Sequence, residues 1–211
     1  MVVGRIIETE ACVAEGAAYL ARRDARMAHA LSLTGPLPLR RRRDGFEALL
    51  SSIVSQQVSV ASANAIWARL QTAGMTVPEA MAVAEEDALR ALGLSRQKAR
   101  YGKALAQAGL DYGALRGLPD AALIAQLVEL PGIGRWTAEI YAMFALGRAD
   151  VFAPGDLALQ EAARLLYGLP DRPDEKTIRA MAEAWSPWRA VAARTLWAYY
   201  RVAKDREGTR P

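Results

Sequence analysis

A short glycine turn and one aspartate are the residues of this chain best suited to do chemistry. The turn spans residues 130–134 (LPGIG) between two helical patterns, and Asp156 ends the Pro-Gly loop 152–156 (FAPGD). A tight turn before a helix exposes backbone N–H groups, which attract anions such as phosphate. The carboxylate in the loop could be the chemical group that the turn positions.

Each feature also has a purely structural alternative. Glycine permits positive φ, so Gly132 and Gly134 would also suit an ordinary turn in a helical bundle. Asp156 directly precedes a predicted helix and can cap it. Two other carboxylates are weaker candidates for chemistry: Asp150 precedes the loop, and Glu139 has the register of a solvated helix face.

Composition limits the classes of protein and site. The chain has 211 residues, 52% of them apolar, enough for a sizeable interior; its net charge of +4 permits a polyanionic partner without requiring one. Cys12 is the only cysteine, which excludes an internal disulfide and argues against a Cys-ligated metal or iron–sulfur cluster. We find no signal-peptide pattern and no membrane-spanning apolar run, and therefore expect a cytoplasmic protein, nucleoid-associated if bacterial.

The periodicity of the chain is helical nearly throughout, which predicts an all-α fold. We expect a break at Ser55-Gln56-Gln57, a capping box formed by Thr76, Pro78 and Glu79, and a frayed tail over 205–211. The predicted helical segments are 8–33, 46–72, 87–92, 95–108, 120–129, 135–146, 157–167, 175–185 and 187–204.

Four segments carry a family resemblance. Residues 130–138 (LPGIGRWTA) resemble the hairpin of the helix-hairpin-helix DNA glycosylase superfamily. Residues 53–61 (IVSQQVSVA) are similar to a signature of its alkylpurine branch, the 3-methyladenine DNA glycosylase II type. The loop 152–156 resembles the one that holds the catalytic aspartate of this family, and SPWR at 186–189, followed by Trp197, resembles its C-terminal helix.

The resemblance implies two helical lobes with the DNA and active-site cleft between them. The central lobe would span 46–115, and the other would combine 1–45 with 116–211 and carry the hairpin and Asp156. Some relatives have an added N-terminal β-rich domain. Because about 45 residues precede the central lobe, we expect the compact form without that domain.

The resemblance also implies an activity. We expect a monofunctional DNA glycosylase that hydrolyses the N-glycosidic bond of alkylated purines, first 3-methyladenine and then 7-methylguanine, in base excision repair. Asp156 would stabilise the positive charge that develops on the sugar. Trp136 stands where lyase-competent relatives have a nucleophilic lysine, and tryptophan cannot form a Schiff base. No cofactor is expected for catalysis.

The substrate pocket implied by the resemblance is less aromatic than is usual in the family. Trp136 and Trp197 match pocket aromatics, with core packing as the alternative role. Tyr141 is a further candidate, but the pocket tyrosine of the family aligns with Ile140. Leu157 likewise stands where the nearest family members carry an aromatic residue.

DNA contacts are expected at two places. The loop with Gln56 and Gln57 would fill the gap left by the flipped base, and Gln57 stands where the best-known branch has an apolar wedge; capping the next helix is its alternative role. Phosphate would bind at the hairpin, through Gly132, Ile133, Gly134, Arg135 and Thr137. By resemblance, the backbone carbonyls of Val128, Leu130 and Ile133 would hold a monovalent or other simple cation.

The remaining charged residues are less specific. Arg40 to Arg43, Arg96, Lys98 and Arg100 would suit phosphate contacts or a solvated basic surface equally. We expect a monomer that binds double-stranded DNA with damaged bases and no membrane. Two alternatives remain: a glycosylase for another damaged base, such as a deaminated or oxidised one, and a non-catalytic helix-hairpin-helix protein that binds DNA lesions.

Overall fold

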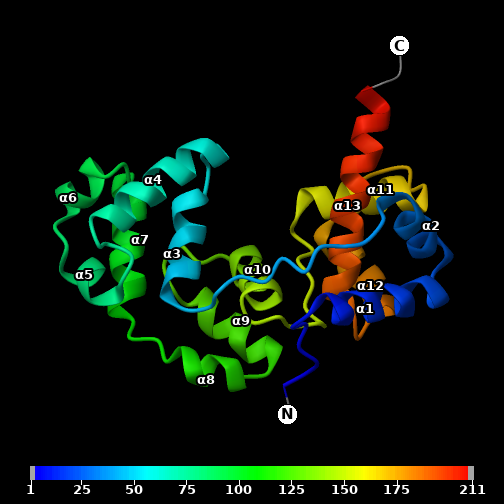
Figure 1. Cartoon of the computed structure of the whole chain (residues 1–211), viewed down its shortest axis with the longest axis horizontal. Coiled ribbons are helices and arrows are strands. Elements are labelled where there is room, and N and C mark those ends of the chain that lie inside the picture. Colours follow the sequence, from blue (N-terminus) through cyan, green and yellow to red (C-terminus); the bar gives the residue numbers. More distant parts are fainter. Residues whose placement is uncertain (1–2, 209–211) are drawn as a thin grey trace. The chain divides into compact units, whose positions relative to one another are not determined.

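The fold is built from helices, as the sequence predicts. The computed structural model describes the backbone of residues 3–208 and the side chains of residues 3–204. Within that part of the chain there are thirteen α-helices, one short 3-10 helix and no strand, only an isolated bridge between Ile6 and Arg148 (Figure 1). No helix among the described residues is long and apolar enough to cross a membrane.

Most predicted helices form close to their expected bounds. The elements are α1 (Glu10–Arg23), α2 (Ala25–Thr34), α3 (Phe46–Ser55), α4 (Val60–Thr72), α5 (Pro78–Val83), α6 (Glu86–Ala91), α7 (Arg96–Gln107), α8 (Tyr112–Gly117), α9 (Asp120–Val128), α10 (Arg135–Phe144), α11 (Leu157–Tyr167), α12 (Glu175–Ala182), η1 (Glu183–Trp185) and α13 (Arg189–Gly208).

Two local expectations were wrong, and one helix was not predicted. The predicted Thr76 capping box does not form, because the N-cap of α5 is Val77 and no side chain caps it. Helix α8, capped by the carboxylate of Asp111, was not predicted, because its six residues are too short to show a periodic pattern. The expected frayed tail is helical to Gly208, and residues 209–211 lie outside the described residues.

The chain divides into two compact units. One contains residues 42–141, and the other combines residues 3–41 with 142–208. Contacts therefore group residues 116–141, including the hairpin, with the central helices. The lobes expected from the sequence divide the chain elsewhere, at 46–115 against 1–45 plus 116–211, and stay a prediction.

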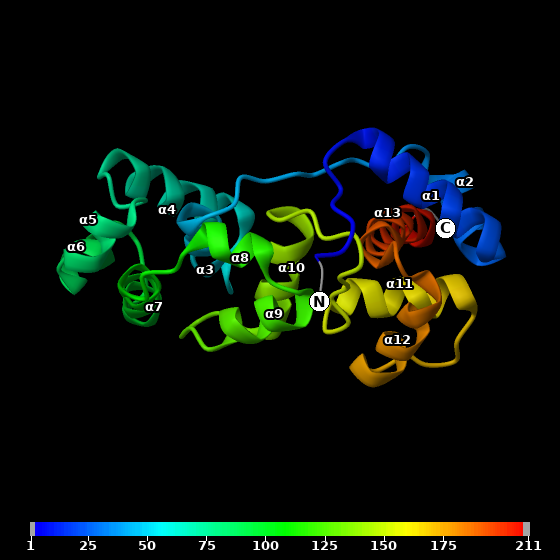
Figure 2. The same cartoon turned by 90° about the horizontal axis from the view of Figure 1, so that it is seen from below.

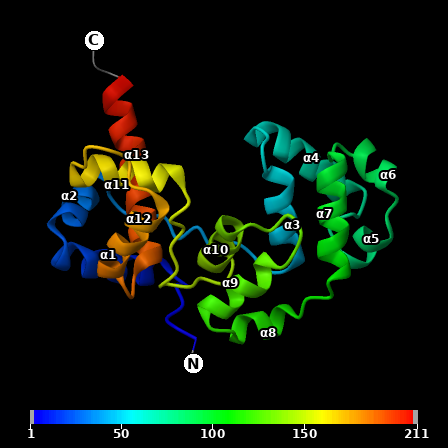
Figure 3. The ribbon, with the colours of Figure 1, turned by 180° about the vertical axis from the view of Figure 1, so that it is seen from behind.

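The unit of residues 42–141 is organised around α7. Helices α3, α5 and α6 all contact α7, with α3 on one side of it and α5 and α6 on the other (Figure 3). The helices pack closely at Gly102, where an added Cβ would lie 3.2 Å from both Leu50 and Met81. Leu49, Ile53 and Leu105 complete this buried interior.

The second unit is organised around α13. Helices α1 and α2 lie on one side of α13, and α11 and α12 lie on the other (Figure 2). Gly16 of α1 lets that helix approach the indole of Trp188, because a Cβ would overlap the ring. Leu20, Met27 and Leu196 are fully buried here. The result is a closely packed frame for the loop that ends at Asp156.

Candidate functional site

The glycine turn forms a compact hairpin between α9 and α10. The Ile133 N–H donates to the Leu130 carbonyl over 3.0 Å, and the Ile133 side chain is buried, as expected for a residue that turns inward between the two helices. Gly132 has φ +86°, and a Cβ there would overlap the Tyr101 ring. Position 132 therefore accepts only glycine without rearrangement.

Gly134 is exposed, and the reason for glycine at this position differs from that at Gly132. A Cβ at this position would meet no atom within 4 Å, and the φ of Gly134 is not in the left-handed region. The fold itself therefore does not require glycine there. A missing side chain at the exposed start of α10 allows a ligand to approach the backbone N–H groups closely.

The first turn of α10 combines exposed and buried side chains. Trp136 is 45% exposed, whereas Thr137 is buried. Glu139 is 2% exposed and accepts from the Arg135 guanidinium over 3.1 Å, so the expectation of a solvated Glu139 was wrong. Arg135 stands four residues before Glu139 on the same face of α10, so its guanidinium lies beside the carboxylate and compensates its burial.

The loop after α3 contacts the hairpin directly. The side-chain amide of Gln56 donates to the Gly132 carbonyl over 2.9 Å. Gln57 is exposed and has φ +55°, a conformation that costs a non-glycine residue about 1–3 kcal/mol and needs support from its surroundings. The sequence motif did not reveal either feature, because both depend on residues distant in the chain.

These segments line a groove of about 620 Å³ within the unit of residues 42–141. Most of the expected DNA-binding residues contribute to it. The lining consists of Gln56, Gln57, Ser95, Gln97, Lys98, Tyr101, residues 128–134 and Thr137. The loop with Gln56 and Gln57, predicted to fill the gap left by the flipped base, and the predicted phosphate site thus form one continuous surface.

The expected cation ligands are backbone carbonyls in the same turn. Val128 is the last residue of α9, and the final carbonyls of a helix lack intrahelical donors. The Leu130 carbonyl already accepts from Ile133, but a carbonyl oxygen has a second lone pair. These oxygens suit a hard cation. No three His, Cys, Asp or Glu side chains gather as a metal site within the described residues.

Asp156 lies in the other unit and caps α11. Its Oδ1 accepts from the backbone N–H of Ala158 over 2.9 Å, from that of Leu159 over 3.0 Å and from the indole Nε1–H of Trp197 over 3.2 Å. The capping role is confirmed. It does not compete with chemistry, because three donors on one oxygen hold a half-buried carboxylate in a fixed orientation.

Trp197 packs beside Phe144, which in turn contacts a buried arginine that the sequence did not predict. The centroid of the Trp197 ring lies 5.8 Å from that of the Phe144 ring. The Arg194 guanidinium lies 4.7 Å from the centroid of the Phe144 ring. Arg194 is 2% exposed. Burial, with repulsion from Arg40 and Arg41, lowers the pKa of Arg194 to about 10. No motif marks Arg194, since it follows only from the packing of α13.

The remaining pocket candidates differ in exposure. Leu157 is 61% exposed beside Asp156, and Ile140 is half-buried on α10. Tyr141 is 4% exposed, and its hydroxyl accepts from the Gly45 N–H over 3.1 Å. Burial raises the pKa of Tyr141. These contacts give Tyr141 the role of a core residue within its unit.

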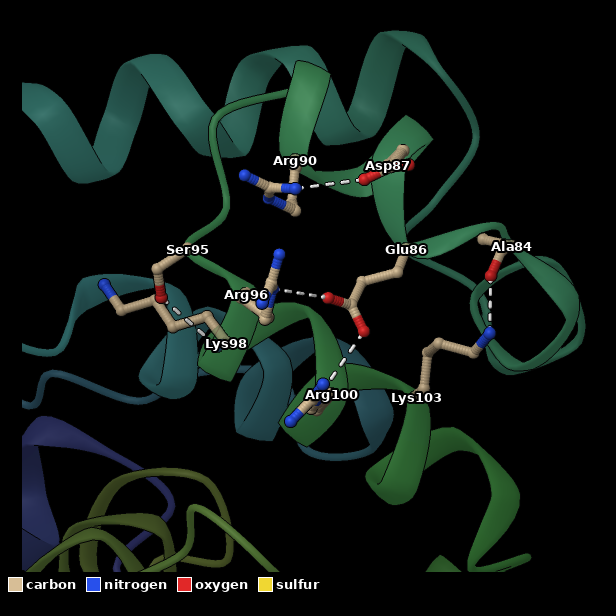
Figure 4. A network of polar contacts seen from close by, with 9 residues as sticks. All are labelled: Ala84, Glu86, Asp87, Arg90, Ser95, Arg96, Lys98, Arg100 and Lys103. Carbon is tan, nitrogen blue, oxygen red and sulfur yellow. Dashed lines mark hydrogen bonds and ion pairs between the residues drawn. The ribbon is translucent and has the colours of Figure 1, made fainter.

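The other charged residues mostly make local contacts. Arg96 and Arg100 each pair with Glu86 at 3.2 Å (Figure 4). Lys98 donates to backbone carbonyls, and Asp150 accepts from Ser186 over 2.8 Å. Arg40 to Arg43 are exposed in the connector, and His29 is exposed on α2.

The comparisons with known proteins agree with this geometry. Residues 50–188 match the family model described as HhH-GPD superfamily base excision DNA repair protein. The DNA-3-methyladenine glycosylase 1 of Schizosaccharomyces pombe is 30% identical over 180 residues, covering 81% of this chain and 78% of that protein.

Two solved structures are similar over most of their length. The Schizosaccharomyces pombe 3-methyladenine DNA glycosylase in complex with abasic DNA has a TM-score of 0.75 and 29% identity, over 87% of this chain and 95% of that one. The DNA-3-methyladenine glycosidase of Bacillus halodurans has a TM-score of 0.81 and 32% identity, over 96% and 95%. The chain therefore belongs to the HhH-GPD superfamily of base excision DNA repair proteins.

Proposed function

We propose that this protein is a monofunctional DNA glycosylase that hydrolyses the N-glycosidic bond of alkylated purines, with 3-methyladenine as the first substrate and 7-methylguanine as a further one. The single observation that carries the proposal is the fixed carboxylate of Asp156, held at Oδ1 by two backbone N–H groups and the Trp197 indole. The relatives named for action on 3-methyladenine support the substrate class.

In the proposed reaction, the C1′–N bond breaks and the bonding electrons leave with the base. Alkylation makes the base a better leaving group, and positive charge develops on the sugar. The Asp156 carboxylate stabilises that charge and orients a water molecule. The water oxygen bonds to C1′ and its proton is released, so the products are a free base and an abasic sugar.

The damaged base must leave the helical stack before it can react. We assign Gln57 to the space left by the base and the exposed start of α10, with Gly134, to a phosphate. The carbonyls of Val128, Leu130 and Ile133 would hold a simple cation that bridges to this phosphate. We propose Trp136 and Ile140 as base-contacting residues of one unit, and Leu157 and Trp197 as base-contacting residues beside Asp156 in the other. We place the enzyme in the cytoplasm as a monomer.

Release of free bases from methylated duplex DNA tests the proposal. The purified chain is incubated with the DNA, and released bases are separated by chromatography. We expect 3-methyladenine to appear with time. DNA with deaminated or oxidised bases, tested in parallel, distinguishes a glycosylase for another lesion. Salt-dependent duplex binding without release of any base would instead identify the non-catalytic lesion-binding protein.

A further inference from the structure

Lys98 makes two hydrogen bonds that the function described so far does not use. Its Nζ donates to the Val54 carbonyl over 2.7 Å and to the Gln56 carbonyl over 2.5 Å. Val54 lies in the last turn of α3, and Gln56 is the C-cap of that helix. The final carbonyls of a helix lack intrahelical donors and carry partial negative charge, so the partly buried Lys98 ammonium is well placed to hold them.

Gln56 connects the same loop to the hairpin. While its backbone carbonyl accepts from Lys98, its side-chain amide donates to the Gly132 carbonyl over 2.9 Å. Gly132 in turn lies against the ring of Tyr101, three residues after Lys98 on α7. Helix α7 thus holds the loop through Lys98 and supports the hairpin through Tyr101.

Gln57 lies next to these contacts and has the least favourable backbone conformation among the residues that line the groove. Gln57 follows Gln56 directly and has φ +55° while its side chain is exposed. A left-handed conformation at a non-glycine residue persists only where neighbouring contacts fix the chain on both sides. The contacts of Lys98 and Gln56 fix the chain immediately before Gln57, and Ser59 caps α4 two residues after it.

We propose that Lys98 and Gln56 are positioning residues that fix the Gln57 loop to the hairpin, so that the plug and the phosphate site meet DNA as one rigid unit. Lys98 therefore has a different role from the phosphate contact that its charge suggests: its ammonium is directed at backbone carbonyls. Burial lowers the pKa of Lys98, in agreement with a partly desolvated position. The proposal is tested by hydrogen exchange in the free protein and by base excision. Only the excision experiment rests on the proposed function.

The same helix offers a matched control. Lys103 is also half-buried on α7, and its Nζ donates to the carbonyl of Ala84, the C-cap of α5, over 2.6 Å (Figure 4). Lys98→Met and Lys103→Met therefore remove the same type of contact from the same helix. Only the first removes it from the Gln57 loop.

The exchange arm measures amide hydrogen exchange in the free protein. The Gln56 N–H donates to Ile53, and the Ile133 N–H donates to Leu130, so both amides report local opening. We expect Lys98→Met to speed exchange at both amides, and Lys103→Met at neither. Gln56→Met, which leaves Lys98 intact, should speed exchange at Ile133. Unchanged exchange at Ile133 in both Lys98→Met and Gln56→Met would overturn the proposal.

The catalytic arm compares two duplexes that differ only opposite the lesion. One has a paired base there and the other an abasic position, which makes the lesion easier to unstack. We expect Lys98→Met to slow excision from the paired duplex by about 10- to 100-fold and from the other duplex much less, because misplacement by about 1 Å has effects of this size. Lys103→Met should match the parent on both.

The outcomes of the two arms separate the claims. Equal losses on both duplexes would show a general structural defect and contradict the positioning role. If the parent releases no base from either duplex, the proposed function fails, and the exchange rates still decide whether Lys98 and Gln56 fix the loop to the hairpin. Melting temperatures of all variants identify any that do not fold, and Gln56→Met then decides the exchange result.

Discussion

The Trp197 indole donates to Asp156 Oδ1 over 3.2 Å, in addition to the two backbone N–H groups that the same oxygen accepts at the start of α11. One carboxylate is thereby held both by its own helix and by a residue of α13. Trp197, for which we propose contact with the base, thus also helps to fix the orientation of the Asp156 carboxylate.

Trp197→Phe tests that role. Phenylalanine retains an aromatic ring beside Phe144 but cannot donate to Asp156. The loss of one hydrogen bond to a charged group, worth about 1.5–3 kcal/mol, predicts a reduction of the single-turnover excision rate by roughly 10- to 100-fold. The measurement is the rate at saturating enzyme. An unchanged rate would show that the two backbone donors are sufficient to orient the carboxylate.

The two hairpin glycines are expected to respond differently to alanine. Gly132→Ala places a Cβ into the Tyr101 ring at φ +86°, so the free protein should lose about 1–3 kcal/mol of unfolding free energy. Gly134→Ala meets no atom within 4 Å, so its stability should change by less than about 0.5 kcal/mol.

DNA binding measures the role that we propose for Gly134 at the phosphate site. Gly134→Ala should weaken duplex binding, because the added methyl group lies where we expect a phosphate to approach the α10 N–H groups. Chemical denaturation and binding titrations at one fixed salt concentration measure the two effects. Parent-like affinity of Gly134→Ala would place the phosphate elsewhere.

Gln57→Ala tests the plug. Alanine removes the side chain that we assign to the gap in the duplex, so excision from a paired duplex should slow by about tenfold or more. The change at this exposed residue should leave the melting temperature within a few degrees of the parent. If the variant excises from paired duplex as fast as the parent, Gln57 has no part in extrusion of the base.

Trp136 predicts the outcome of a trapping experiment. An enzyme that uses an amine nucleophile forms a Schiff base, which borohydride reduces to a permanent protein–DNA adduct. With tryptophan at position 136, we expect free base and an intact abasic strand and no adduct on a denaturing gel. A borohydride-dependent adduct would show that another amine of the chain acts as a nucleophile and that the enzyme has lyase activity.

Local sequence patterns predicted what depends on neighbours in the chain. The helix that starts at Leu157 and its Asp156 cap could be predicted because a cap and a helical period are visible within a few residues. The burial of Ile133 likewise depends on close neighbours, because an apolar residue in a tight turn between two helices packs between them.

Contacts between distant segments could not be predicted in this way. The sequence shows a basic residue at Lys98 but not that its ammonium reaches carbonyls at the end of α3. Arg194 next to Phe144 likewise depends on how α13 packs.

The most direct test of the central claim compares the parent with Asp156→Asn on one duplex that contains a single 3-methyladenine or a stable analogue. Asparagine is as good an N-cap as aspartate and retains a carbonyl oxygen for the three donors, so the variant should fold and bind the duplex like the parent. Without the negative charge, base release should slow by about 10²- to 10⁴-fold. Release at the rate of the parent would contradict the assignment of Asp156 as the catalytic residue.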